Sequence, residues 1–276
     1  MPETGGEGDD TFYGSNSVAG SFYGNGGNDW LRSGLAADVF DGGQGRDTVD
    51  YSRENAGVSV NLASGVGARG DQLVSVEDVV GSSFNDTIAG TSGDNRLDGG
   101  AGVDTVSYAA ASAAVTVSLL LEGLAQNTGG AGVDTLTRLQ NLTGSAYADN
   151  LTGNKSDNVL LGGGGNDHLY GDAGNDSLVG GDGYDWLYGG GGANTLAGGL
   201  GDDTYVLEGP DMIQEFAGAG FDTVNVSWAQ SARFAYTLSA NLEILNFHGA
   251  AGADILGNAM EVQDLQVRRQ GVGEPR

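Results

Sequence analysis

Acidic and amide side chains recur along the chain at a spacing that would stack them in a repetitive fold. One set at 18-residue intervals, which we call the main ladder, consists of Asp149, Asp167, Asp185 and Asp203. A second set at the same interval, the second ladder, consists of Asn158, Asp176 and Asn194. Carboxylate oxygens gathered in this way suit a hard multivalent cation. We therefore predict cation binding, tighter on the main ladder because every member carries a carboxylate.

The overall charge supports the same chemistry. The chain has 37 acidic and 11 basic residues among 276, which gives a formal net charge of -26. So many carboxylates repel one another in a compact state unless cations neutralise them, and they make a phosphate backbone a poor partner. We predict no nucleic-acid binding. A merely solvated acidic surface is the alternative explanation of the charge.

Several classes of protein are excluded by what the sequence lacks. There is no cysteine, so neither a disulfide framework nor a thiolate metal site is possible. No apolar run approaches 18 residues, so no membrane-spanning helix is expected. The first ten residues lack a basic stretch followed by an apolar one, and we predict no cleavable signal peptide.

A nine-residue unit, Gly-Gly-x-Gly-x-Asp-x-apolar-x, explains the spacing of the aspartates. Seven units follow one another without a gap from Gly144 to Val206, and further copies begin at Gly5, Gly24, Gly42, Gly99 and Gly129. The 52 glycines suit tight turns that need positive φ angles. Each unit is thus predicted to be one turn followed by one short strand.

The eighth position of the unit is always apolar. In the main array it is occupied by Leu151, Leu160, Leu169, Leu178, Leu187, Leu196 and Tyr205. A three-residue strand turns its central side chain inward and the two flanking side chains outward. Because one such strand cannot bury its side chain alone, two units should form an 18-residue coil that stacks on the next coil through parallel strands.

These nonapeptides resemble the hemolysin-type calcium-binding repeats of RTX proteins. The resemblance covers roughly residues 5 to 259 and implies an all-β fold, a right-handed parallel β-roll with short strands and calcium-binding turns. It also implies several calcium ions, held by aspartates and by the carbonyl groups of the second and fourth glycines. In the main array these glycines are Gly163, Gly165, Gly181, Gly183, Gly199 and Gly201.

Aspartates one coil apart are expected to share a calcium ion. The predicted metal-binding aspartates are Asp10, Asp29, Asp38, Asp47, Asp86, Asp104, Asp134, Asp149, Asp167, Asp176, Asp185 and Asp203. Asp149 is expected to be the weakest member of the main ladder because its loop, GSAYAD, lacks two of the glycines. Five motif aspartates lack a clean partner by spacing, namely Asp10, Asp38, Asp134, Asp222 and Asp254. The alternative is that the aspartates only form side-chain turns with the backbone.

The repeats divide the chain into five predicted segments. They are a first array at 5–50, two related spacer units at 51–143, the main β-roll at 144–206, a degenerate repeat with flanking strands at 207–259, and a disordered tail at 260–276. The spacer units are an internal duplication, since Gly42–Asp98 aligns with Gly99–Leu161. Alternating apolar residues at Val58, Val60 and Leu62 predict strands that continue or flank the roll.

The chain carries none of the usual catalytic motifs. It has no HExxH helix, GxSxG elbow, P-loop or nucleophilic cysteine, so we predict that it is not itself an enzyme. Outward positions of the main array carry His168, Tyr170, Trp186 and Tyr188. This aromatic strip is a candidate surface for a polysaccharide or a partner domain, or it only shields the sheet.

The function that these observations favour is a calcium-binding β-roll module of a secreted bacterial protein. It would fold on calcium binding after export by a type I route and act as a stabiliser and spacer. The alternatives are a repeat module of a polysaccharide-modifying enzyme, similar to the mannuronan epimerases, or a segment of a cell-surface adhesin.

Overall fold

The computed structural model describes residues 2–216, 219–227, 242, 244–248 and 266–269. The chain divides into two compact units, which are considered separately. Unit 1 comprises Met1–Ala113 and Leu121–Asn141, and unit 2 comprises Ala114–Leu120 and Leu142–Arg276. The predicted first array at 5–50 thus lies in unit 1 and the main array at 144–206 in unit 2.

Unit 1 consists of short strands in parallel ladders, joined at one place by an antiparallel hairpin. One ladder contains β2 (Thr11–Tyr13), β4 (Trp30–Arg32), β6 (Thr48–Asp50), β9 (Asp78–Val80), β11 (Arg96–Asp98) and the hairpin β14–β15 (Ala125–Gly129, Gly132–Thr137). Another set of parallel strands contains β1 (Glu3–Thr4), β3 (Ser21–Tyr23), β5 (Val39–Asp41) and β8 (Gln72–Val74). A third set contains β7 (Ser59–Asn61), β10 (Thr87–Ala89) and β12 (Thr105–Ser107).

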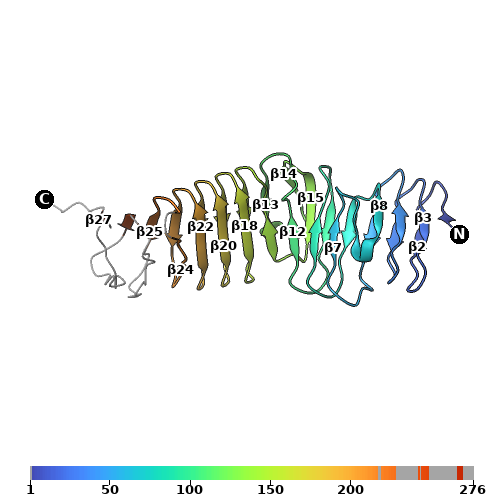
Figure 1. The fold of residues 1–276 in the computed structure, drawn as a ribbon, viewed down its shortest axis with the longest axis horizontal. Coiled ribbons are helices and arrows are strands. Elements are labelled where there is room, and N and C mark those ends of the chain that lie inside the picture. The colour runs from blue at the N-terminus through green and yellow to red at the C-terminus, as the bar shows by residue number, and fades with distance from the viewer. Residues whose placement is uncertain (1, 217–218, 228–241, 243, 249–265, 270–276) are drawn as a thin grey trace. The chain divides into compact units, whose positions relative to one another are not determined.

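Unit 2 stacks its strands in two ladders. One contains β13 (Thr116–Ser118), β17 (Asn150–Thr152), β19 (His168–Tyr170), β21 (Trp186–Tyr188), β23 (Thr204–Leu207), β25 (Thr223–Ser227), β26 (Ile244–His248) and β27 (Gln266–Arg269). The other contains β16 (Asn141–Thr143), β18 (Val159–Gly164), β20 (Ser177–Asp182), β22 (Thr195–Leu200) and β24 (Met212–Ile213), which lie side by side in Figure 1. The described helices, η1 (Ala68–Gly70) and η2 (Leu119–Leu121), are single 3-10 turns.

The register of the strands confirms the 18-residue coil. Leu151 pairs with Leu169 and Leu160 pairs with Leu178, in both cases between parallel strands. The eighth-position side chains of the main array all have an exposed fraction of 0% and form the core between the ladders. The all-β, parallel β-roll predicted from the sequence is therefore confirmed.

The predicted spacer strands also belong to the parallel ladders. Val60 lies in β7 and pairs with Ile88 of β10 in unit 1, and Val117 lies in β13 and pairs with Leu151 of β17 in unit 2. Within the predicted tail, 260–276, the structure describes only β27, which pairs in parallel with β26. The rest of the tail, and much of the predicted segment 207–259, lies outside the described residues.

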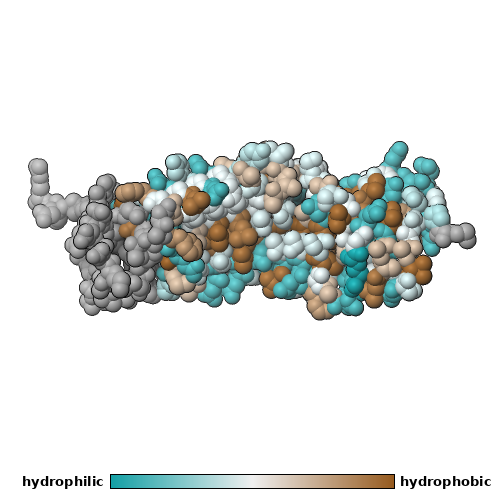
Figure 2. All heavy atoms as spheres, viewed as in Figure 1, coloured by the Kyte–Doolittle hydropathy of each residue, from teal (hydrophilic) through white to brown (hydrophobic). Residues whose placement is uncertain are grey.

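The surface of unit 2 is not uniformly polar. Figure 2 shows hydrophobic residues gathered over the β18–β22 face, where Val159, Leu161 and Val179 are exposed. These residues flank the buried eighth positions and therefore point outward. Among the residues that the structure describes, no helix has the length and apolar character needed to cross a membrane.

Candidate metal centre

One carboxylate oxygen of each ladder aspartate is used to stack the coils. The backbone N–H of Asp149 donates to Oδ1 of Asp167, that of Asp167 to Asp185, and that of Asp185 to Asp203, each at 2.8 Å. The predicted pairs of unit 1 are stacked in the same way, Asp29 on Asp47 at 2.7 Å and Asp86 on Asp104 at 2.8 Å. The backbone-turn explanation therefore accounts for one oxygen of each carboxylate.

The second oxygen, Oδ2, is buried without a hydrogen-bond partner in many of these aspartates. The set includes Asp29, Asp47, Asp104, Asp167, Asp176, Asp185 and Asp203. A buried acceptor without a partner costs about 1–3 kcal/mol, and more when the group is charged. The fold repeats this arrangement at the position where the sequence predicts a cation, and a bound cation would remove the cost.

A backbone carbonyl converges on the same point as Oδ2 in all of these aspartates except Asp203. A Cβ on Gly162, the first residue of its repeat, would lie 2.2 Å from Oδ2 of Asp167 and 2.6 Å from the carbonyl oxygen of Gly180. A Cβ on Gly180 would likewise lie 2.2 Å from Oδ2 of Asp185 and 2.5 Å from the carbonyl oxygen of Gly198. The two oxygens fill the space that a side chain would need. They are also the donor types that calcium prefers, so the residues fit this ion.

The carbonyl that meets Oδ2 belongs to the first glycine of the repeat, which the sequence did not single out. The predicted second-glycine carbonyls point along the stack instead, since a Cβ on Gly181 would lie 2.0 Å from the oxygen of Gly163. The equivalent distance from Gly199 to the oxygen of Gly181 is 2.1 Å. The fourth glycines stack in the same way, as Gly165, Gly183 and Gly201. Calcium ligation by these carbonyls stays a prediction.

Most of the described loops fall into two classes according to the second residue of the repeat. In open loops this residue has a left-handed backbone, as in Gly163 (φ 112°), Gly181 (φ 121°) and Asp172 (φ 75°), and Oδ2 of the loop aspartate has no hydrogen-bond partner. In closed loops the N–H of the second residue donates to the carboxylate or amide at the sixth position. The closed loops are those of Asp10, Asp86, Asn95, Asp149 and Asn158.

Serine completes the closure of two of these loops. The hydroxyl of Ser145 donates to Oδ1 of Asp149 at 2.9 Å, and that of Ser82 donates to Oδ1 of Asp86 at 2.7 Å. Serine is strained in the left-handed region that glycine adopts freely, which favours closure. The closed loops of Asp86 and Asp149 fit a side-chain turn better than a calcium site. Closure of the loop is a structural reason to expect weak calcium binding at Asp149, and the same reason applies to Asp86.

Amide groups occupy part of the second ladder. The backbone N–H of Asn158 donates to Asp176 at 2.8 Å, and that of Asp176 donates to Oδ1 of Asn194 at 2.8 Å. Asn194 also donates from its side chain to Asp211 at 2.8 Å. The sequence missed Asp211, because a 17-residue offset takes the place of 18 at this step. The second ladder thus extends to a further carboxylate.

Four of the five aspartates that lack a clean partner by spacing have one in the structure, and the fifth, Asp254, lies outside the described residues. Loops of unusual length bring distant residues into the ladders. In each pair the backbone N–H of the first residue donates to the carboxylate of the second. The pairs are Asp10 and Asp29 (2.8 Å), Asp38 and Asp71 (2.7 Å), Asn95 and Asp134 (2.9 Å), and Asp203 and Asp222 (2.9 Å). Two polar residues continue ladders in unit 1 in the same manner, Glu77 above Asp47 at 2.9 Å and Gln140 above Asp104 at 2.7 Å.

Burial and mutual repulsion favour the neutral form of the ladder carboxylates in the absence of a cation. Burial raises the pKa of Asp167 and of Asp203 to about 7, and the charges of neighbouring ladder aspartates add to the rise. Burial likewise raises the pKa to about 6 for Asp47, Asp104, Asp134 and Asp176. A divalent cation between the carboxylates would reverse this effect, because it stabilises the charged form.

The aromatic strip lies on the outer face of β19 and β21. The rings of His168 and Trp186 are stacked, with centroids 6.2 Å apart and an interplanar angle of 16°. The rings of Tyr170 and Tyr188 are 6.1 Å apart and tilted. Trp186 keeps 42% of its surface exposed. Beside the strip is an open groove of about 530 Å³, lined by Thr152, Tyr170, Asp172, Tyr188, Gly190, Gly191 and Glu208.

Comparison with known proteins places the repeats in a family. No curated protein matches the chain. The sequence model of the RTX calcium-binding nonapeptide repeat, which spans four copies, matches residues 4–17, 21–55, 80–110, 143–178 and 170–205. These ranges contain the open loops of both units and make up more than half of the chain. The chain belongs to the family of proteins built from RTX calcium-binding nonapeptide repeats.

Proposed function

We propose that the chain is a non-enzymatic module that folds when calcium fills the open loops. The observation that carries this proposal is the buried, unpartnered Oδ2 that faces a carbonyl oxygen of the next coil, repeated at Asp167, Asp176 and Asp185. Calcium joins a carboxylate and a carbonyl that would otherwise lie buried without a partner. Each ion then links neighbouring coils, so that ion binding and folding become one event.

The calcium dependence of the secondary structure tests this proposal. We expect the full chain in a chelator to lack most of its β signal in far-ultraviolet circular dichroism, and to gain that signal cooperatively as calcium is added. Magnesium is the control ion, because it needs near-octahedral geometry and releases its water reluctantly. A β spectrum at low ionic strength that is equal with and without calcium would show that the loops are structural turns alone.

We further propose that the module works outside the cell. RTX repeats are typical of secreted proteins. Extracellular calcium modules bind their ion at roughly 10⁻⁴ to 10⁻³ M, so the chain would stay unfolded in a calcium-poor cytoplasm and fold after export. A type I export route suits a chain that crosses the membrane unfolded. Once folded, the roll serves as a stabiliser and spacer of the protein that contains it.

The aromatic strip supports a second candidate function, polysaccharide binding. Flat exposed rings stack on sugar rings, and the carboxylates of Asp172 and Glu208 at the neighbouring groove are acceptors for sugar hydroxyl groups. The side chain of Tyr188 is hydrogen-bonded to Glu208, and burial together with that bond raises the pKa of Tyr188 to about 12. A repeat module of a mannuronan-epimerase-like enzyme or of an adhesin would use such a surface.

Retention on immobilised alginate tests the second candidate. Replacing Trp186 and Tyr188 with serine should abolish retention in saturating calcium. Replacing the exposed Tyr147, which lies outside the strip, is the matched control. Equal retention of all three proteins, or no retention of the unmodified chain, would leave the strip as a covering of the sheet.

A further inference from the structure

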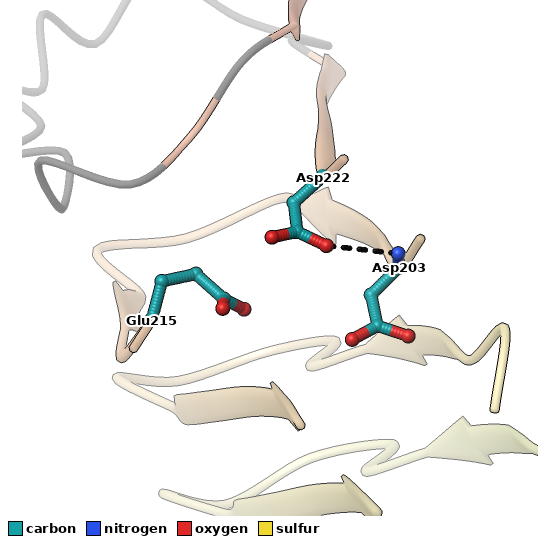
Figure 3. A group of neighbouring side chains, drawn as sticks. All are labelled: Asp203, Glu215 and Asp222. Atoms are coloured by element: carbon teal, nitrogen blue, oxygen red, sulfur yellow. Dashed lines mark hydrogen bonds between the residues drawn. The ribbon is translucent and has the colours of Figure 1, made fainter. Parts of the chain in front are cut away.

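Three carboxylates converge where the main ladder meets the turn after β24. The side chains of Asp203, Glu215 and Asp222 each offer an oxygen, and these oxygens all lie within 4.8 Å of one another. Figure 3 shows the carboxylates directed toward a common space, with the N–H of Asp203 bonded to Asp222 at 2.9 Å. Asp203 and Asp222 are each only 1% exposed, and Glu215 is partly buried.

One oxygen in the cluster has nothing in the protein to bind. Oδ2 of Asp203 is buried and lacks a hydrogen-bond partner, whereas its Oδ1 accepts the N–H of Asp185 at 2.8 Å. A buried carboxylate oxygen that faces two further carboxylates is unfavourable unless a cation lies among them. This unpartnered atom is an observation independent of the clustering itself, and it points to a bound ion.

Glu215 stands where the array places a first glycine. Ile213 of β24 pairs with Leu196 of β22, so Glu215 corresponds in register to Gly198. At Gly180 the second oxygen close to the Cβ position is the Gly198 carbonyl, at 2.5 Å. At Gly198 the oxygens nearest to the Cβ position are Oδ2 of Asp203, at 2.0 Å, and the hydroxyl of Tyr205, at 2.5 Å. The Tyr205 hydroxyl thus stands in place of the backbone carbonyl at this position, and the additional carboxylate near Asp203 is that of Glu215.

The sequence makes room for this side chain. Gly198 and Asp203 are five residues apart, as in every regular repeat, whereas Glu215 and Asp222 are seven residues apart. The loop that begins at Glu215 is therefore two residues longer than that of a regular repeat, at the position where a side chain takes the place of glycine. The same electrostatic conflict is visible in Glu215 itself, because burial and the charges of Asp222 and Asp203 raise its pKa to about 8.

We propose that Asp203, Glu215 and Asp222 form a calcium site that differs from those of the repeats. Three carboxylates hold the ion where a repeat offers an aspartate and carbonyls. Affinity among calcium sites rises with the number of charged ligands. This site should therefore fill at a lower calcium concentration than the open loops and hold the end of the regular array in place. The proposal rests on the proposed calcium-dependent function.

Calorimetric titration of the full chain with calcium chloride tests the site. Glu215→Gln should abolish the tightest binding phase, or weaken it by about 10-fold or more as expected from ligand charge, and leave the later phases in place. Glu3→Gln is the control, because Glu3 is an exposed glutamate outside both the cluster and the groove. Glu215→Asp keeps the charge on a shorter side chain and should weaken the same phase less than Glu215→Gln.

The outcomes separate this inference from the proposed function. If the unmodified chain binds calcium and Glu215→Gln binds it with the same stoichiometry and affinities, the three-carboxylate site is wrong and the module function stands. If the unmodified chain binds no calcium, both fail. Circular dichroism in saturating calcium checks that each variant folds. If Glu215→Gln does not fold, the affinity of the tightest phase in Glu215→Asp tests the site instead.

Discussion

At the scale of single residues, the two oxygens of a ladder aspartate have different roles. Oδ1 of Asp185 accepts the N–H of Asp167 and keeps the coils in register, whereas Oδ2 is left for the ion. An asparagine side chain can accept the same N–H through its Oδ1, but it lacks the negative charge that the carboxylate offers to the ion. The chain already uses asparagine in this manner at Asn194, which accepts the N–H of Asp176.

Replacing Asp185 with asparagine should therefore weaken calcium binding without preventing folding. The amide oxygen retains the hydrogen bond from Asp167, and the lost charge raises the calcium concentration at the midpoint of the circular-dichroism transition. In saturating calcium the β signal should be unchanged. Asp182→Asn is the matched control, because it removes an exposed carboxylate from the same repeat. Equal midpoints for the two variants would contradict the role assigned to Oδ2.

The loop of Asp86 allows the opposite experiment. Ser82→Gly removes the hydroxyl that binds Asp86 and permits the left-handed backbone of an open loop. The variant should bind one more calcium ion in equilibrium dialysis. The lost hydrogen bond is worth about 0.5–1.5 kcal/mol net, so before the new site fills the variant should be less stable by this amount. Ser83→Gly, at the exposed neighbouring position, should change neither quantity. Unchanged stoichiometry in Ser82→Gly would show that loop closure does not exclude the ion.

At the scale of the repeat, the sequence predicted the strands because one inward side chain every nine residues is a strong signal. The same periodicity identified Asp167, Asp185 and Asp203 as one ladder. It failed where loops change length, so Asp71, Asp211 and Glu215 were not recognised as neighbours of ladder residues. The distinction between open and closed loops was also missed, since it depends on the backbone angle of the second residue rather than on the aspartate.

The repeat makes a direct prediction about its core. Leu178 is completely buried in β20, and the next residue, Val179, is 36% exposed. Leu178→Ala should lower the free energy of unfolding in saturating calcium by about 2–5 kcal/mol through the cavity that it leaves. Val179→Ala should change it much less. Thermal melts of both variants check the difference, and similar losses would contradict the assignment of position eight as the inward one.

At the scale of the whole molecule, the two units differ in how far basic side chains neutralise their carboxylates. Unit 1 contains four ion pairs between arginine and acidic residues, Arg32–Asp50, Arg46–Asp78, Arg69–Glu54 and Arg138–Asp98. Residues 142–227 of unit 2 contain thirteen acidic residues and the single cation Lys155. Unit 2 therefore depends more on bound cations. Hydrogen exchange in a chelator should show its amides losing protection before those of unit 1, and the reverse order would contradict this.

The ladder carboxylates also predict how pH acts on the calcium-free chain. The pKa of Asp167 and of Asp203 is raised from 3.8 to about 7 in the folded state. The folded state therefore binds more protons than the unfolded state between these values, and its stability falls as pH rises. This contribution is complete below about pH 4 and is lost as pH rises through about 7. In a chelator the β signal should increase from pH 8 to pH 5, and a signal that decreases over this range would contradict the prediction.

A crystal structure of the calcium-loaded chain tests the central claim most directly. Ions should lie 2.3–2.6 Å from Oδ2 of Asp167 and of Asp185 and from the first-glycine carbonyls of the following coils. The closed loops of Asp86 and Asp149 should contain no ion. If the open loops hold only water, or if ions fill open and closed loops alike, the account of these loops as calcium-dependent links between coils is wrong.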